Sequence, residues 1–149
     1  QSAGAEPAGA GSHDRCDAVG EKHVIRAVRG AVGVDNNDAQ EIYSDAHRLV
    51  REILGRNSIE EQQIVSIMFS VTKDLTKGNP ATGLRSFGFA DTPLFCVQEA
   101  DIEGAEPRIL RVLVTYRAAE AAAPVPVYLG RAMELRPDLT ETAEGERRT

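Results

Sequence analysis

The chain of 149 residues contains no tryptophan, only two cysteines and only three lysines. Two cysteines, Cys16 and Cys96, cannot build the disulfide framework on which small secreted domains depend. No apolar run reaches the roughly 18 residues that cross a bilayer, and the first residues lack the apolar stretch of a secretory signal. We therefore expect a cytoplasmic protein that does not interact with membranes.

The sequence also lacks an excess of positive charge. It carries 17 basic and 23 acidic side chains, for a formal net charge of −6, which argues against nucleic acid and against anionic membrane surfaces as partners. Fourteen of the basic residues are arginine, whose planar guanidinium grips carboxylates and phosphates through paired hydrogen bonds. Either a GC-rich genome or an anionic ligand explains this excess, and composition alone does not decide between them.

Familiar catalytic motifs are missing as well. The sequence contains no CxxC, HExxH, Walker A or GxGxxG pattern, and its three histidines are scattered. Zinc, nucleotide and dinucleotide sites therefore lack their usual signals, and we expect neither a metal nor a cofactor. No nucleophile–base pair or acid/base dyad is recognisable either, so a site in this chain should work by binding anions and arranging charge.

The composition does support one folded domain, because 42% of the residues are hydrophobic. Residues 1–22 are rich in alanine, glycine and charge without a period, and we expect them to form a flexible N-terminal tail. Residues 140–149 are expected to form a flexible C-terminal tail. The domain should then span residues 23–139.

Hydrophobic periodicity predicts five strands and two helices in that domain. The apolar spacing of Ile42, Ala46 and Leu49 predicts an amphipathic helix over 38–54, and Pro80 should begin a short helix that ends near Gly88. Ser58 and Glu61 have the spacing of a capping box and should start a short helical turn. Strands are expected over 24–32, 64–72, 92–99, 108–116 and 127–135.

This order of elements predicts an α/β (α+β) domain with a mixed five-stranded sheet and two helices. So few helices leave one face of the sheet uncovered, which predicts oligomerisation. In the first strand Ile25, Ala27 and Arg29 share one face, and the pattern indicates that this is an apolar face carrying an arginine.

Arg29 and Arg111 are the first candidate site residues, because each interrupts an otherwise apolar or small-residue strand. A buried guanidinium requires an anion, supplied by the protein or by a ligand. Glu99 ends the third strand and is either the ion-pair partner of Arg111 or a site carboxylate. Cys96 is better interpreted as a small buried residue than as a nucleophile, because no histidine is placed to activate it. Tyr128 either packs or hydrogen-bonds a carboxylate.

Several segments together resemble the AroH-class chorismate mutases, in order and with similar spacing. They are RAVRGA (26–31), T-x-DL-x₄-PA-x₃-R (72–85), PLFCVQEADIEGA (93–105), LRV (110–112), VYL (127–129) and LRPDL (135–139). The resemblance implies a homotrimer that forms a pseudo-α/β-barrel, with an active site in each cleft between subunits. It also implies the Claisen rearrangement of chorismate to prephenate on the way to phenylalanine and tyrosine. That reaction is unimolecular and uses no nucleophile, metal or cofactor.

The resemblance also assigns roles to individual residues. It implies that Arg111 contacts the ether oxygen and that Glu99 receives the ring hydroxyl and faces the developing ring cation. Arg29 and Tyr128 would hold the side-chain carboxylate, and Cys96 would help to bind the hydroxyl. Further matching positions at the mouth and walls of the cleft are Arg85, Arg136, Ala81, Leu94, Phe95 and Leu135.

The chain departs from the family pattern in the loop expected to cover the cleft. Asn79 stands where an aromatic residue is common, Thr82 where lysine occurs, and Lys73 where proline is usual, while Phe95 is bulkier than the usual residue. Two alternatives therefore stay open beside a chorismate mutase. One is an enzyme of the same family retuned to a related chorismate-derived enol ether, and the other is a catalytically silent trimer that binds a carboxylate ligand.

Overall fold

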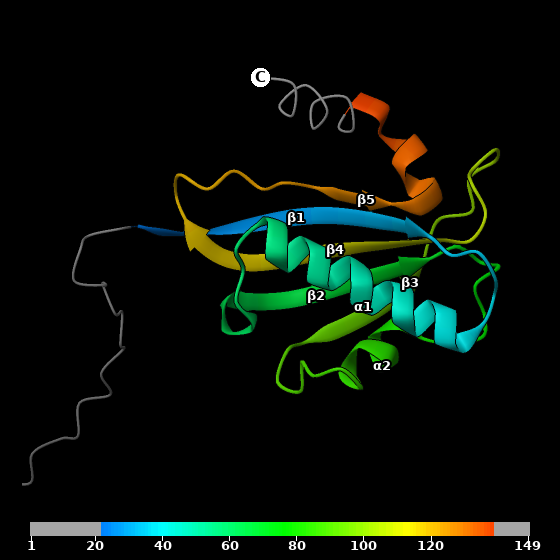
Figure 1. The fold of residues 1–149 in the computed structure, drawn as a ribbon, viewed down its shortest axis with the longest axis horizontal. Helices are drawn as coiled ribbons and strands as arrows, with labels where there is room; N and C mark the ends of the chain where they lie inside the picture. Colours follow the sequence, from blue (N-terminus) through cyan, green and yellow to red (C-terminus); the bar gives the residue numbers. More distant parts are fainter. Residues whose placement is uncertain (1–21, 139–149) are drawn as a thin grey trace, which may run out of the picture.

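The structure is a computed structural model that describes residues 22–138. The tail predicted over 140–149, Leu139 and all of the tail predicted over 1–22 except Lys22 lie outside the described residues. The elements follow the predicted order (Figure 1). They are β1 (His23–Gly33), α1 (Ala39–Arg56), the 3₁₀ turn η1 (Glu61–Gln63), β2 (Ile64–Val71), α2 (Pro80–Arg85), β3 (Leu94–Gln98), β4 (Ile109–Ala119), β5 (Val127–Leu129) and the 3₁₀ helix η2 (Gly130–Leu135).

The five strands form one mixed sheet in the order β3-β2-β4-β1-β5. The central strand β4 pairs antiparallel with β1 on one side and with β2 on the other. The two outer strands pair in parallel, β5 with β1 and β3 with β2. The predicted mixed five-stranded sheet with two helices is therefore confirmed.

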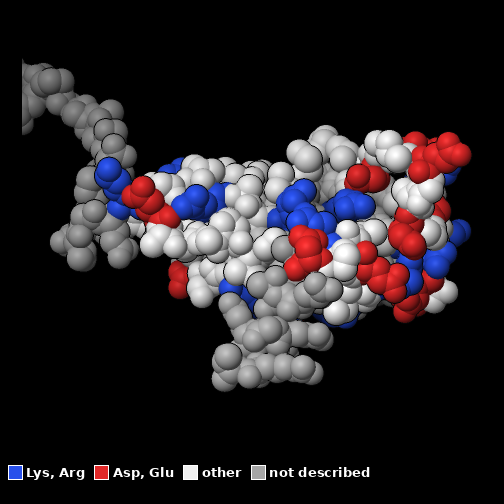
Figure 2. Space-filling view, turned by 90° about the horizontal axis from the view of Figure 1, so that it is seen from above, with Lys and Arg blue, Asp and Glu red and all other residues white. Residues whose placement is uncertain are grey.

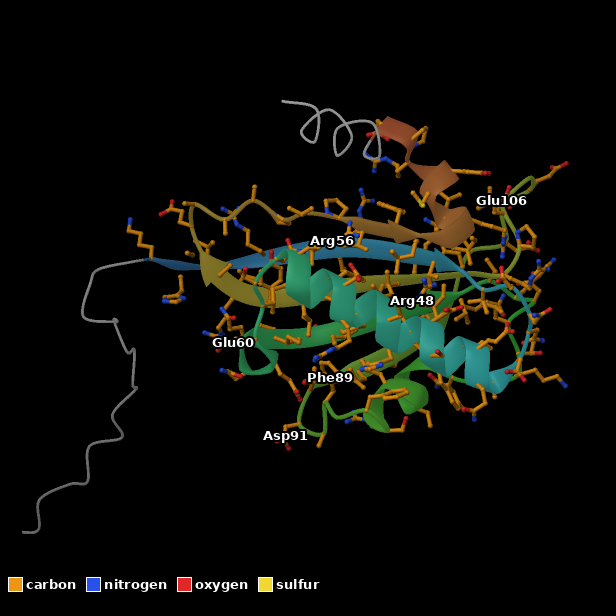
Figure 3. The ribbon with its side chains drawn as sticks, viewed as in Figure 1. Arg48, Arg56, Glu60, Phe89, Asp91 and Glu106 are labelled. Atoms are coloured by element: carbon orange, nitrogen blue, oxygen red, sulfur yellow. The ribbon has the colours of Figure 1, made fainter. Side chains whose placement is uncertain are left out.

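Both α-helices lie on the same face of this sheet (Figure 1). Helix α1 begins at the N-cap Asp38, whose carboxylate accepts a hydrogen bond from the Glu41 N–H at 3.1 Å. Its apolar stripe is buried against the sheet, whereas Arg48 and Arg56 point away from the core (Figure 3). None of the helices within residues 22–138 is long and apolar enough to cross a membrane.

The opposite face of the sheet is open in the single chain. The side chains of β1 that pack under α1 are the even-numbered ones, with Val28 1% and Val32 0% exposed. Ile25 lies on the other face and is 58% exposed, so the face shared with Arg29 is the uncovered one. Helix α1 packs closely on the face of β1 that carries Gly30, since a Cβ on Gly30 would lie 2.7 Å from Ile53 Cδ1.

The last predicted strand, 127–135, is wrong beyond its third residue. Strand β5 ends at Leu129, and Gly130 adopts a φ of +56°, which turns the chain into η2. Ala132 of this 3₁₀ helix is fully buried against Ala31 and Ile109. The residues after Gly130 therefore form a helical turn that packs against β1 and β5.

The predicted capping box at Ser58 is also wrong by two residues. Ser58 has a φ of +51°, a left-handed conformation that lies outside the extended geometry of an N-cap. The cap is Glu60, whose N–H donates to the side-chain oxygen of Gln63 at 2.7 Å. The short turn therefore exists but starts later than predicted.

Candidate active site

Two neighbouring strands place both candidate arginines on the open face. Arg29 of β1 is the register partner of Leu113 on β4, and Arg111 lies two residues before Leu113 on the same side of that strand. Arg111 is in turn the register partner of Ser70 on β2. The side chains of Arg29 and Arg111 are therefore diagonal neighbours on one surface.

A hollow of about 290 Å³ opens on this surface. Its charged and polar side chains come from β1, β2, β4 and β5 and from Glu99 just beyond the end of β3, over a floor of apolar residues. The lining residues are Arg29, Gly30, Met68, Phe69, Ser70, Glu99, Arg111, Val112, Leu113 and Tyr128. Four residues predicted from the sequence, Arg29, Glu99, Arg111 and Tyr128, thus meet at one place.

Glu99 is held at the rim of the hollow by the backbone and by Ser70. The Glu99 N–H donates to the carbonyl oxygen of Val71 at 2.8 Å, which fixes the residue beyond the last paired position of β3. The Ser70 hydroxyl donates to Glu99 Oε2. The same oxygen lies 3.7 Å from Arg111 Nε, so the carboxylate and the guanidinium form an open ion pair.

The two guanidinium groups differ in their surroundings. Within residues 22–138, Arg29 makes no hydrogen bond or ion pair, and its side chain is exposed on the open face. The Nε atom of Arg111 is buried and finds no hydrogen-bond partner in the same part of the chain. Both cations therefore have unused donors, which is the arrangement that an anionic ligand requires.

Tyr128 borders the hollow from the other side of β1. It is the register partner of Ala31 and packs, half-buried, on the cluster of Ala31, Ile109 and Ala132. Leu135 packs on the same cluster. Arg136 follows directly and pairs with Asp138 through two contacts of 3.0 and 3.1 Å, and these contacts, with a smaller contribution from Tyr128, raise the pKa of its guanidinium.

The remaining predicted residues lie around the far edge of the sheet. Three of them lie on strand β3, which forms that edge. Another three lie in helix α2, and the last is the N-cap of that helix. The structure does not bring them into the hollow of the same chain. They are Asn79, Ala81, Thr82, Arg85, Leu94, Phe95 and Cys96.

Two of these edge residues have structural partners that the sequence did not indicate. Asn79 is the N-cap of α2, and its side-chain oxygen accepts the Ala81 N–H at 2.9 Å. Arg85 donates to the carbonyl oxygens of Phe89, Ala90 and Thr92 at 3.1 to 3.3 Å. The asparagine that departs from the family pattern thus begins the helix, and Arg85 closes the loop that follows it.

Cys96 points away from the open face. It is the register partner of the fully buried Phe69 and packs against the core beneath the helices. Burial raises the pKa of its thiol. A raised pKa keeps the thiol protonated at neutral pH, which agrees with the prediction that Cys96 is no nucleophile.

Ser70 and a second hollow next to Glu99 were not predicted from the sequence. The only signal for Ser70 was a polar residue inside an apolar strand. The second hollow measures about 380 Å³ and shares Glu99 and Arg111 with the first. Lys73, one of the departures from the family pattern, lines it and pairs with Asp101 at 2.9 Å.

Charge on the surface is unevenly distributed. Figure 2 shows basic side chains gathered toward the middle of one face and acidic ones concentrated at one end of the molecule. For a protein of net charge −6, attraction of an anion must therefore be local rather than long-range. The donors of Arg29 and Arg111 that have no partner in the described part of the chain supply that local attraction.

Comparisons with known proteins identify the family of the chain. The family model for chorismate mutase type I matches residues 25–139. The chorismate mutase AroH of Thermus thermophilus is 33% identical over 118 residues, which cover 78% of this chain and 97% of the relative. That of Bacillus subtilis is 31% identical over 125 residues, covering 83% and 98%.

A solved structure, a chorismate mutase from Clostridium thermocellum, has the same fold with a TM-score of 0.66 and 34% sequence identity. The match covers 73% of this chain and 98% of that one. The family model's range, residues 25–139, includes Arg29, Glu99, Arg111 and Tyr128. The chain belongs to the chorismate mutase type I family.

Proposed function

We propose that the protein catalyses the Claisen rearrangement of chorismate to prephenate. The observation that carries the proposal is the open ion pair of Arg111 and Glu99, 3.7 Å apart, beside Arg29, which has no ion-pair partner among residues 22–138. Chorismate carries two carboxylates, a hydroxyl and an enol ether, and this hollow offers two cations, a carboxylate and a phenol. Family membership supports the same conclusion.

The reaction breaks the ether C–O bond while a C–C bond forms between the side chain and the ring. Six electrons move in one cyclic transition state, and no proton or group leaves the molecule. Negative charge grows on the ether oxygen and positive charge on the ring. The protein therefore has to hold the reactive conformer and present fixed charges to these two regions.

In this proposal each group has one task. Arg111 donates to the ether oxygen as its charge grows and also to the side-chain carboxylate. Arg29 and Tyr128 bind that carboxylate, and Glu99 accepts the ring hydroxyl while facing the developing cation. Because the charges are in place before the reaction starts, little reorganisation is needed when the bond breaks.

We further propose that a neighbouring copy completes the site in a homotrimer. The open face carries exposed apolar side chains that a second copy would cover, among them Ile25 (58% exposed), Met68 (45%) and Phe95 (61%). The predicted residues split into the hollow and the β3–α2 edge, and an interface would join the two sets. The neighbour would then contribute Cys96, Thr82 and Arg85, together with the wall residues Ala81, Leu94 and Phe95.

Replacing Arg111 by alanine tests the catalytic proposal. Loss of a charge contact made in the transition state should lower turnover of chorismate by about 10² to 10³. Arg117→Ala is the matched control, because Arg117 lies on the same strand and the same face but outside the hollow. Turnover should be unchanged in Arg117→Ala. Equal rates in wild type and Arg111→Ala would refute the mechanism.

The alternatives give different results in the same assay. A wild-type protein that binds chorismate without consuming it is a silent carboxylate-binding protein. One that leaves chorismate intact but rearranges a related enol ether is a retuned enzyme. Light scattering tests the trimer separately, and a stable monomer would contradict the shared site. Cytoplasmic location stays a prediction from the sequence.

A further inference from the structure

We propose that Ser70 is a positioning residue that keeps the Glu99 carboxylate from closing onto the Arg111 guanidinium, so that both charges stay available to the substrate. The inference rests on the proposed function, because it explains how a site with opposite charges at close range avoids neutralising itself. Ser70 does not need to touch the substrate in this role.

The geometry places Ser70 between the two charged residues. Ser70 and Arg111 are register partners on β2 and β4, and both side chains stand on the open face. The backbone of Glu99 is tied to Val71, the residue after Ser70, by the 2.8 Å hydrogen bond to its carbonyl oxygen. The Ser70 hydroxyl then donates to Glu99 Oε2 from the β2 side.

Arg111 and Glu99 would form a tighter pair without this hydrogen bond. Arginine–carboxylate pairs in direct contact have N–O distances of about 2.7 to 2.9 Å and often form two parallel hydrogen bonds. Here the distance from Nε to Oε2 is 3.7 Å, beyond hydrogen-bond length, and Nε has no hydrogen-bond partner among residues 22–138. The hydroxyl and the guanidinium compete for the same oxygen, and the hydroxyl holds it.

The open pair has a direct consequence for the chemistry. A closed pair would use the Arg111 donors that the ether oxygen and the side-chain carboxylate need. It would also turn the Glu99 charge toward the guanidinium and away from the substrate ring. Substrate would have to break the closed pair first, so KM should rise, and a displaced Glu99 would lower kcat as well.

The experiment compares three substitutions in β2 of the full chain with chorismate as substrate. Ser70→Ala removes the hydroxyl, and kcat/KM should fall by about tenfold, the loss expected when a hydrogen bond to a charged group disappears. Ser70→Thr keeps the hydroxyl on a side chain suited to a strand, and it should restore at least half of the wild-type value. Ser66→Ala, on the same strand and face but outside the hollow, should leave kcat/KM unchanged.

A double-mutant cycle separates positioning from a general structural role. If Ser70 acts through Glu99, Ser70→Ala should cost less than twofold in a Glu99→Gln background. A tenfold loss in that background would overturn the inference, because Ser70 would then act independently of Glu99. A Ser70→Ala variant as active as wild type, or a Ser70→Thr variant as poor as Ser70→Ala, would overturn it too.

A crystal structure of Ser70→Ala gives a readout that does not depend on activity. The Arg111–Glu99 distance should contract from 3.7 Å to about 2.8 Å. An unchanged distance would overturn the inference even if activity falls. A wild-type protein that does not rearrange chorismate would refute the proposed function, while the contracted distance would still support the spacing role of Ser70.

Discussion

Replacing Gly83 by alanine tests how tightly α2 is packed on α1. A Cβ atom on Gly83 would lie 2.3 Å from Tyr43 Cδ1, 2.6 Å from Cγ and 2.8 Å from Cβ. Tyr43 cannot easily move aside, because a Cβ on Gly78 would also meet its ring at 2.8 Å. The tyrosine is thus confined between two glycines, and the atoms that clash lie at the rigid base of its side chain.

The size of the effect follows from two opposing contributions. Alanine favours a helix over glycine by about 1 kcal/mol, whereas overpacking a core costs about 1–3 kcal/mol. Contacts as short as 2.3 Å place Gly83 at the upper end of that range, so we expect Gly83→Ala to lose about 2 kcal/mol. Beyond its chain neighbours and the backbone of its own helix, no atom of the described residues lies within 4 Å of a Cβ on Gly55, so Gly55→Ala should gain about 0.5–1 kcal/mol.

Urea unfolding at one protein concentration measures both variants against wild type. The concentration must be fixed because the proposed trimer would make stability depend on it. The midpoints should move in opposite directions while the m-value stays constant. Equal midpoints for Gly83→Ala and Gly55→Ala would refute the packing argument, since the two substitutions differ only in what surrounds the new methyl group.

Three further predictions concern the loops, pH and the thiol. Asp74→Ala should destabilise the protein by about 1–3 kcal/mol in urea unfolding, because both carboxylate oxygens accept the Arg108 N–H and that donor would lose its partner. Burial, with a contribution from a nearby arginine, lowers the pKa of His47 from its ordinary value of 6.5. The unfolded chain therefore binds a proton first, so unfolding free energy should fall as pH drops below about 6.5, and His47→Gln should flatten that slope. In a Cys16→Ser background, iodoacetamide should modify Cys96 more slowly than a free thiol at pH 8, because burial raises its pKa; equal rates would contradict that burial.

The sequence was a good guide to element order because each element has its own local signal. Helix α1 has a strong apolar period and an N-cap, and Pro80 begins α2 as predicted. Strand β2 is a nearly continuous apolar run, interrupted by Ser66 and Ser70, and was found with nearly the predicted bounds. The 127–135 strand failed because apolar content alone does not reveal that Gly130 takes a positive φ.

Long-range relations were beyond local patterns. Strand β1 has small or apolar residues on both faces, so alternation could not show that Val28 faces the helices and Arg29 the open side. Strand order and the pairing of Ser70 with Arg111 depend on register between segments far apart in the chain. The strand pattern gave the first candidates, and the family resemblance gave their roles and the other site residues. The structure added how Ser70 and Glu99 are connected.

The pairing of β1 with β4 also determines when this chain can fold. His23 pairs with Ala119 and Gly33 with Ile109, so the first strand has no central partner until almost the whole domain has been synthesised. The other neighbour of β1, strand β5, lies later still. Nearly all of the sheet therefore forms through contacts of large sequence separation, which slows folding. The apolar side chains of β1 stay exposed during synthesis until their partner strands are available. Such a domain should complete its sheet late, only after β4 and β5 have left the ribosome.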